Sequence, residues 1–290
     1  MTGRSDAAGC TISQPDFATA AAQNNLSLRI PTPLFGAGLI ESISDATILA
    51  NKASSAPVKA ALGIRGHENR SGNDGTIMRF GWKAQNKSLT IFTGEAYNVE
   101  QGVTNEVFPA ERDETPGRGF NQTPEDRTDA TASSVLKGIS DVTAISAFMR
   151  FLAPPRPAPD NASIVNGRQL FTQIGCSVCH TPALTTGNAS SPTVRNQSAN
   201  LYSDLLLHRM GAGLADGVTQ GDAQGDDWRT APLWGLGQRL FYLHDGRTSD
   251  LTQAIQMHAS QNPEANGAVG NFNGLSAAAK QDLINFPRSL

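Results

Sequence analysis

Two cysteines and a histidine stand close together in the second half of the chain. Cys176 and Cys179 are separated by a serine and a valine, and His180 follows directly. This C-x-x-C-H spacing is typical of c-type haem attachment. Two thiols three positions apart can reach both vinyl groups of one porphyrin, and the next imidazole can then bind the iron from the same side. The motif therefore predicts one covalently bound haem c with His180 as an axial ligand.

Other interpretations of the two thiols find less support in the sequence. A zinc site would need a second pair of ligands, and no other cysteine lies nearby. A redox-active dithiol of the thioredoxin type belongs in a βαβ pattern, which is missing around residue 176. The third cysteine, Cys10, has no evident partner, and its role stays open.

The iron's second axial position could be empty, or filled by Met, His or Tyr. The candidates downstream of the motif are His208, Met210, His244, Met257 and His258. His258 lies on the apolar face of a helix expected at 249–259, whereas Met257 is turned about 100° away from it. A histidine on an apolar face is more often a core residue than a ligand. From spacing alone, His258 and Met210 are equally good candidates.

Charge and hydropathy exclude two classes of partner. The 290 residues carry a net charge of −3, so the chain has no basic footprint for nucleic acid. No run approaches the roughly 18 apolar residues of a membrane span, and the N-terminus lacks the apolar core of a secretory signal. Covalent haem attachment nevertheless indicates a periplasmic or otherwise extracytoplasmic location. We expect a small redox protein or another electron donor as partner; the oligomeric state stays open.

Most elements that the sequence predicts are helices. Apolar residues recur at helical spacing over 139–152, and a proline-rich stretch at 154–159 ends that helix. Further helical patterns cover 46–53, 79–103, 166–175, 201–210, 249–259 and 276–286, the first with Ser44 and Asp45 at its cap and the last with Ser276 at its cap. We therefore predict a mainly α protein. Residues 1–155 form a loop-rich helical region, and 156–290 form a cytochrome c-like haem domain.

Beyond these patterns, longer stretches resemble the bacterial di-haem cytochrome c peroxidase superfamily. They are most similar to its di-haem oxidoreductase branch, also labelled thiol oxidoreductase. The resemblance covers about residues 30–290, in the family's own order. Its main strings are PTPLFGAGLIE (31–41), RFGWKAQ (79–85), FLAPPRP (151–157), GRQLFTQIGCSVCH (167–180), YSDLLLHRMGAGLADG (202–217), DWRTAPLWGLG (227–237) and FYLHDGRTSDLTQAI (241–255).

The resemblance assigns expected roles to individual residues. The family's distal ligand lies on the helix after the H-x-G segment, and in this branch it is usually a histidine, so His258 becomes the preferred sixth ligand over Met210. His244 falls on a histidine that recurs near the haem edge, and Arg247 could pair with a propionate; otherwise the two are a loop histidine and a surface arginine. Trp228 and Arg229 are expected to line the haem pocket.

One departure from the family affects the expected function. Its members carry two haems, and a first C-x-x-C-H domain precedes the stretch that matches 31–41, whereas this sequence holds a single such motif. We expect an N-terminally truncated chain that carries the electron-transfer haem of a di-haem peroxidase-like oxidoreductase. The alternative is a stand-alone one-haem electron carrier without catalysis. Catalytic residues are not predicted in either case.

Overall fold

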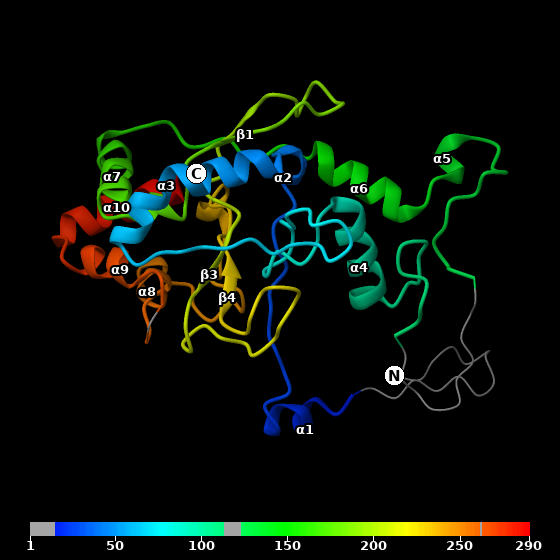
Figure 1. Cartoon of the computed structure of the whole chain (residues 1–290), viewed down its shortest axis with the longest axis horizontal. Helices are drawn as coiled ribbons and strands as arrows, with labels where there is room; N and C mark the ends of the chain where they lie inside the picture. The colour runs from blue at the N-terminus through cyan, green and yellow to red at the C-terminus, as the bar shows by residue number, and fades with distance from the viewer. Residues whose placement is uncertain (1–14, 113–122, 262) are drawn as a thin grey trace. The chain divides into compact units, whose positions relative to one another are not determined.

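Helices make up most of the regular structure in the computed structural model, which describes residues 15–112, 123–261 and 263–290 (Figure 1). The expected mainly α class is confirmed. The α-helices are α1 (Phe17–Ala22), α2 (Ala37–Ser42), α3 (Asp45–Ala61), α4 (Leu89–Gln101), α5 (Val135–Gly138), α6 (Asp141–Phe151), α7 (Ala162–Gln173), α8 (Leu251–Gln256), α9 (Asn266–Asn273) and α10 (Ala277–Arg288). In these described stretches, none of the helices is long and apolar enough to cross a membrane. Cys10 lies outside the described residues.

The chain divides into two compact units. The described parts of 1–27 and 90–148 form one unit, and residues 28–89 together with 149–290 form the other. The unit with the haem motif is thus larger than segment 156–290, because it also takes in residues 28–89 and with them α2 and α3. The division into domains 1–155 and 156–290 stays a prediction.

In the first unit, a single carboxylate caps the start of α6. Asp126 accepts hydrogen bonds from the backbone N–H groups of Asp141 (2.6 Å) and Val142 (2.9 Å). This cap satisfies two donors that the first helical turn leaves free.

The helix expected over 139–152 is confirmed as a helix, α6, which covers Asp141–Phe151. The helical pattern over 79–103 is correct only from Leu89, and residues 79–88 form turns instead.

In the second unit, α7 and α10 lie side by side (Figure 1). Their contact includes Phe171 and Phe286, whose ring centroids are 5.3 Å apart. Gly167 allows the close approach, because a Cβ atom there would lie 2.0 Å from the carbonyl oxygen of Asp282. Ser276 caps α10 as predicted, since its hydroxyl accepts a hydrogen bond from the Ala279 N–H at 3.2 Å.

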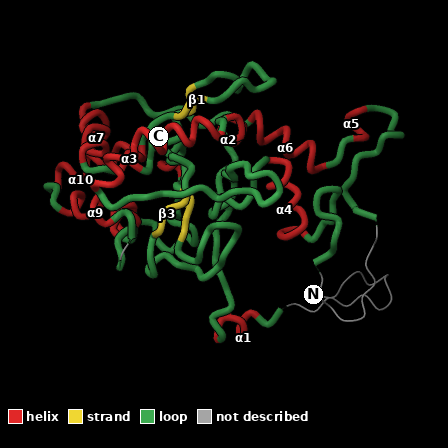
Figure 2. Tube along the Cα trace, viewed as in Figure 1, coloured by secondary structure: helices red, strands yellow, loops and turns green. Residues whose placement is uncertain are grey.

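Two small antiparallel sheets complete this unit. Strand β1 (Leu184–Thr185) pairs with β2 (Ser198–Ala199), and β3 (Leu207–Arg209) pairs with β4 (Asp227–Arg229) (Figure 2). The prediction of a helix over 201–210 is therefore wrong. Leu205, Leu206 and Leu207 are all buried, and a short continuous apolar run does not distinguish a buried strand from a buried helix.

Candidate haem-binding site

The C-x-x-C-H motif begins directly after α7, but the helix does not run into it. Gly175 has a φ of 97°, a left-handed conformation that favours glycine, and it ends the helical path. Residues Cys176–Val178 then form a 3₁₀ turn, η1. The N–H of His180 donates to the carbonyl of Cys176 at 2.9 Å, so the imidazole follows the thiols by one turn.

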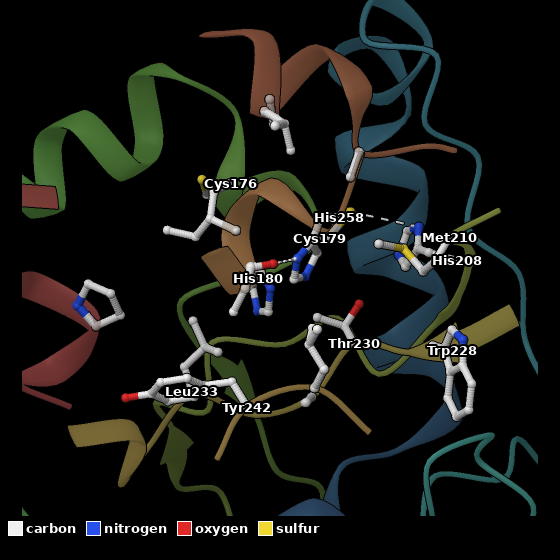
Figure 3. A pocket seen from close by; sticks show the side chains of 18 of the residues that line it. Cys176, Cys179, His180, His208, Met210, Trp228, Thr230, Leu233, Tyr242 and His258 are labelled. Atoms are coloured by element: carbon white, nitrogen blue, oxygen red, sulfur yellow. Dashed lines mark hydrogen bonds between the residues drawn. The ribbon is translucent and has the colours of Figure 1, made fainter. Parts of the chain in front are cut away.

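A cavity of about 230 Å³ lies beside the motif and is lined mostly by apolar side chains. It brings together seven of the residues singled out in the sequence: Cys176, Cys179, His180, Trp228, Arg229, His244 and His258. Figure 3 shows Cys176, His180 and His258 together around the centre of the view, with Trp228 at its edge. These residues are spread over 83 positions of the chain, so the fold has gathered them at one place.

The imidazole of His180 is oriented by a backbone carbonyl. Its Nδ1 lies 3.0 Å from the oxygen of Tyr202, so a proton on Nδ1 leaves the Nε2 lone pair available to a metal. Tyr202 has a φ of 52°, a left-handed conformation that costs a residue other than glycine roughly 1 kcal/mol or more. Burial lowers the pKa of His180 to about 4, which keeps the ring neutral as a ligand requires.

His258 has the same arrangement. It lies just after α8, and its Nδ1 is 2.7 Å from the carbonyl oxygen of Ala254 one turn earlier. Burial lowers the pKa of His258 as well. The helix expected at 249–259 is shorter in the structure. Asp250 caps its start, and the helix ends at Gln256. Two neutral imidazoles thus line one cavity, each with Nδ1 engaged by a backbone carbonyl and Nε2 left for a metal.

Met210, the other candidate ligand, also lines the cavity. It is buried and packs in a cluster with Leu214, Trp82 and Trp228. Packing of this kind is typical of a methionine in an apolar core. The imidazoles of His180 and His258 are oriented by hydrogen bonds, whereas no described residue forms such a bond with the side chain of Met210.

These residues fit a c-type haem. Two thiols and two imidazoles line a largely apolar cavity, and this donor set matches covalent attachment and bis-histidine ligation. A zinc site is less consistent with the surroundings, because no group of three or more His, Cys, Asp and Glu side chains within the described residues is arranged to hold a metal ion. Burial and the neighbouring Cys179 raise the pKa of the Cys176 thiol to about 12.

Buried charges surround Cys179. His208 lies between Asp204 (Nε2 to Oδ2, 3.0 Å) and Glu264 (Nδ1 to Oε2, 2.7 Å), and Lys59 of α3 reaches the same Asp204 oxygen at 2.8 Å. Burial alone would lower the pKa of His208, but Cys179 and Asp204 more than offset this and raise it well above its ordinary value. The two cations and two carboxylates balance, so this wall adds little net charge.

Aromatic rings form another part of the wall. The indole of Trp82 meets His244 edge-on, with ring centroids 6.4 Å apart, and its Nε1 donates to the carbonyl of Ile30 at 2.7 Å. Trp228 donates from Nε1 to the carbonyl of Leu214 at 2.9 Å. These hydrogen bonds fix both indoles, so the wall is preformed rather than assembled around a ligand.

Arg247, which the resemblance singled out for a propionate, and Met257, one of the candidate ligands, are not among the cavity-lining residues. For Arg247 the contacts explain this. Its side chain pairs with Asp245 at 2.6 Å, and it donates to the carbonyl of Gly213 at 2.7 Å. In its place Arg239 lines the cavity, together with Tyr242. The sequence contains no signal for Arg239, because it follows a short 3₁₀ turn, η2 (Leu236–Gln238), in an irregular stretch without periodicity.

Comparisons with known proteins point to one family. The family model described as "Di-haem oxidoreductase, putative peroxidase" matches residues 12–290. No curated protein matches the chain. Among solved structures, a Kuenenia stuttgartiensis hydrazine synthase is 18% identical with a TM-score of 0.33, and the match covers 51% of this chain and 55% of that one.

A MauG-like protein associated with microbial copper homeostasis is another similar solved structure. It is 15% identical with a TM-score of 0.39, and the match covers 91% of each chain. This chain therefore spans about half the length of the hydrazine synthase chain and most of the MauG-like one. Both likenesses are too slight to support a conclusion about activity. The family model, which covers nearly the whole chain, carries the assignment.

Proposed function

Because this chain belongs to the di-haem oxidoreductase family, we propose that it holds one haem c and acts as the electron-transfer part of a peroxidase-like oxidoreductase. Cys176 and Cys179 would hold the haem through thioether bonds, and His180 and His258 would bind its iron. The count of one haem rests on the single C-x-x-C-H motif in the 290 residues. We place the protein in the periplasm or another extracytoplasmic compartment, where such haems are attached.

One observation carries the proposal: His180 and His258 line the same cavity as both motif thiols, and each imidazole has Nδ1 bound to a backbone carbonyl. This arrangement sets the tautomer before any ligand binds, because the carbonyl oxygen accepts only from a protonated Nδ1. It supports a site in which both imidazoles would bind the iron and leave no open position. A site of this type favours electron transfer, since the protein does not need to reorganise around an open position.

Haem c, when bound, supplies an iron that takes up and releases one electron. The chain's own contribution is to hold two neutral imidazoles, to keep water away with apolar walls such as Leu236 and Leu251, and to fix the orientation of the indoles of Trp82 and Trp228. We propose a small redox protein or a comparable electron donor as the partner.

The test is maturation in a periplasm that contains the cytochrome c maturation machinery. The wild-type chain should retain haem on a denaturing gel, and intact-mass measurement should show the addition of one haem. Replacing both Cys176 and Cys179 by alanine should abolish the staining. A colourless wild-type protein that contains zinc would contradict the proposal.

A further inference from the structure

Two arginines from different segments line the cavity, close enough for their charges to interact. Arg229 ends β4, and Arg239 follows η2. The side chain of Arg229 is held in place by backbone carbonyls, since Nε donates to Gly81 at 3.0 Å and NH1 donates to Thr230 at 3.2 Å. The side chain of Arg239 makes no hydrogen bond or ion pair with any residue that the structure describes, and only its backbone N–H donates, to the carbonyl of Leu236 at 3.1 Å. Neither guanidinium therefore has a carboxylate partner there.

This lack of a partner sets Arg229 apart from the other buried cations. Four lysine and arginine side chains are buried in the described part of the chain, and Arg229 is one of them, 7% exposed. The other three have carboxylate partners: Lys59 with Asp204, Arg79 with Asp45 and Lys83 with Asp216. A buried charge without a counterion is costly, so a cavity wall that keeps one is built to receive an anion.

The neighbourhood of the two arginines increases that need. Burial and the nearby charge of Arg239 lower the pKa of Arg229 to about 10. Two like charges in one cavity repel each other, and an anion placed between them would relieve this repulsion. Guanidinium groups bind carboxylates well because their planar N–H donors match two carboxylate oxygens.

The haem assigned to this cavity carries two carboxylates, its propionates, on one edge. We infer that Arg229 and Arg239 bind these propionates and thereby determine the orientation of the porphyrin in the cavity. This inference rests on the proposed function. Arg247 does not take this role, because Asp245 already neutralises it and it does not line the cavity. The chemistry recognised is a carboxylate, which could also come from a free acid in solution.

The experiment uses the haem-loaded full chain and compares Arg239→Gln, Arg229→Lys and the wild type. Arg195→Gln is the matched control, because Arg195 donates only to carbonyls of its own loop and does not line the cavity. Two quantities are measured: the midpoint potential by redox titration, and the propionate bending bands by resonance Raman spectroscopy. Arg247→Gln tests the competing residue.

Arg239→Gln should lower the midpoint potential, because losing a positive charge beside the haem favours the ferric form. At a fixed solution potential the ferric-to-ferrous ratio should rise roughly tenfold, as expected for one unit charge at an effective dielectric constant of about 20. Tenfold corresponds to about 59 mV for one electron. Arg229→Lys keeps the charge but loses the planar donors, so it should shift the propionate bands with a smaller change in potential. The control should change neither quantity.

Three outcomes would overturn the inference alone, and a fourth would overturn it together with the proposed function. Haem-loaded Arg239→Gln and Arg229→Lys proteins with wild-type potentials and wild-type propionate bands would contradict it while leaving the proposed function intact. The inference is also contradicted if, among the variants, only Arg247→Gln shifts the midpoint potential and the propionate bands. A shift of the wild-type bands by added acetate would likewise contradict it, because it would reveal a site for free carboxylates. A chain that takes up no haem would contradict the proposed function and this inference together.

Discussion

The imidazole of His244 stacks on the indole of Trp228, with ring centroids 3.7 Å apart and planes inclined by 15°. The ammonium of Lys83 lies over the same indole, 4.1 Å from its centroid, while it donates to the carbonyls of Gln224 (2.7 Å) and Asp227 (3.0 Å). A cation over an aromatic face is stabilising, and burial of His244 in this stack disfavours the charged form of its imidazole. The charge state of His244 is thus linked to the packing of the cavity wall.

The stack predicts a loss of stability in acid. Burial lowers the pKa of His244 from 6.5 to about 4, so between these pH values the unfolded chain binds a proton that the folded chain does not. The free energy of unfolding should fall as the pH falls from about 6.5 to 4, by at most about 3 kcal/mol from this residue. Above pH 6.5 the residue should contribute no pH dependence.

His244→Phe keeps a ring in the stack and removes the titrating group. Urea denaturation of the two haem-loaded proteins at several pH values measures the difference, and titration of the other histidines cancels in the comparison. Equal pH dependence for wild type and variant would contradict the prediction, because it would show that His244 binds protons equally in the folded and the unfolded chain.

His258→Ala should convert the haem from low-spin to high-spin, because it removes the Nε2 that the Ala254 carbonyl leaves available. The visible absorption spectrum reports the change, and added imidazole should restore the low-spin form. Met210→Leu is the matched variant and should leave the spectrum unchanged, since Met210 packs as a core residue. The reverse pattern would make Met210 the ligand.

The 290-residue chain should reduce hydrogen peroxide slowly. Peroxide reduction needs an iron with an open or displaceable position and nearby acid–base groups, and two bound imidazoles leave no such position. Stopped-flow measurement of peroxide consumption should give a rate close to that of free haem, whereas dithionite should reduce the haem readily. His258→Ala should react faster. Fast, saturable turnover by the wild type would make its own haem catalytic.

The space around two glycines predicts opposite effects of alanine substitution on stability. Gly167→Ala would place a Cβ 2.0 Å from the Asp282 carbonyl oxygen, so the helices must separate, at a cost of about 1–3 kcal/mol. Gly270→Ala, in α9, meets no atom within 4 Å and should stabilise the protein by about 0.4–1 kcal/mol. Thermal unfolding measures both changes. Equal effects would contradict the close approach at Gly167.

Short-range patterns in the sequence were sufficient to predict the haem motif and most of the helices. Cys176, Cys179 and His180 are neighbours in the chain, so their spacing alone carries their chemistry. The cap at Ser276 is equally local, because a serine hydroxyl reaches the N–H three residues ahead. Resemblance to a family, rather than periodicity, singled out His258.

Only the tertiary structure decided which side chains share the cavity and which charges remain unpaired there. The pairing of β3 with β4 joins residues about 20 positions apart, and a buried apolar run such as Leu205–Leu207 carries no periodicity that would reveal it. The resemblance singled out Arg247 and not Arg239, yet Asp245 neutralises the first, whereas the second lines the cavity together with Arg229. The physical reason is that burial and counterion contact depend on the packing of distant segments, which local residue order does not encode.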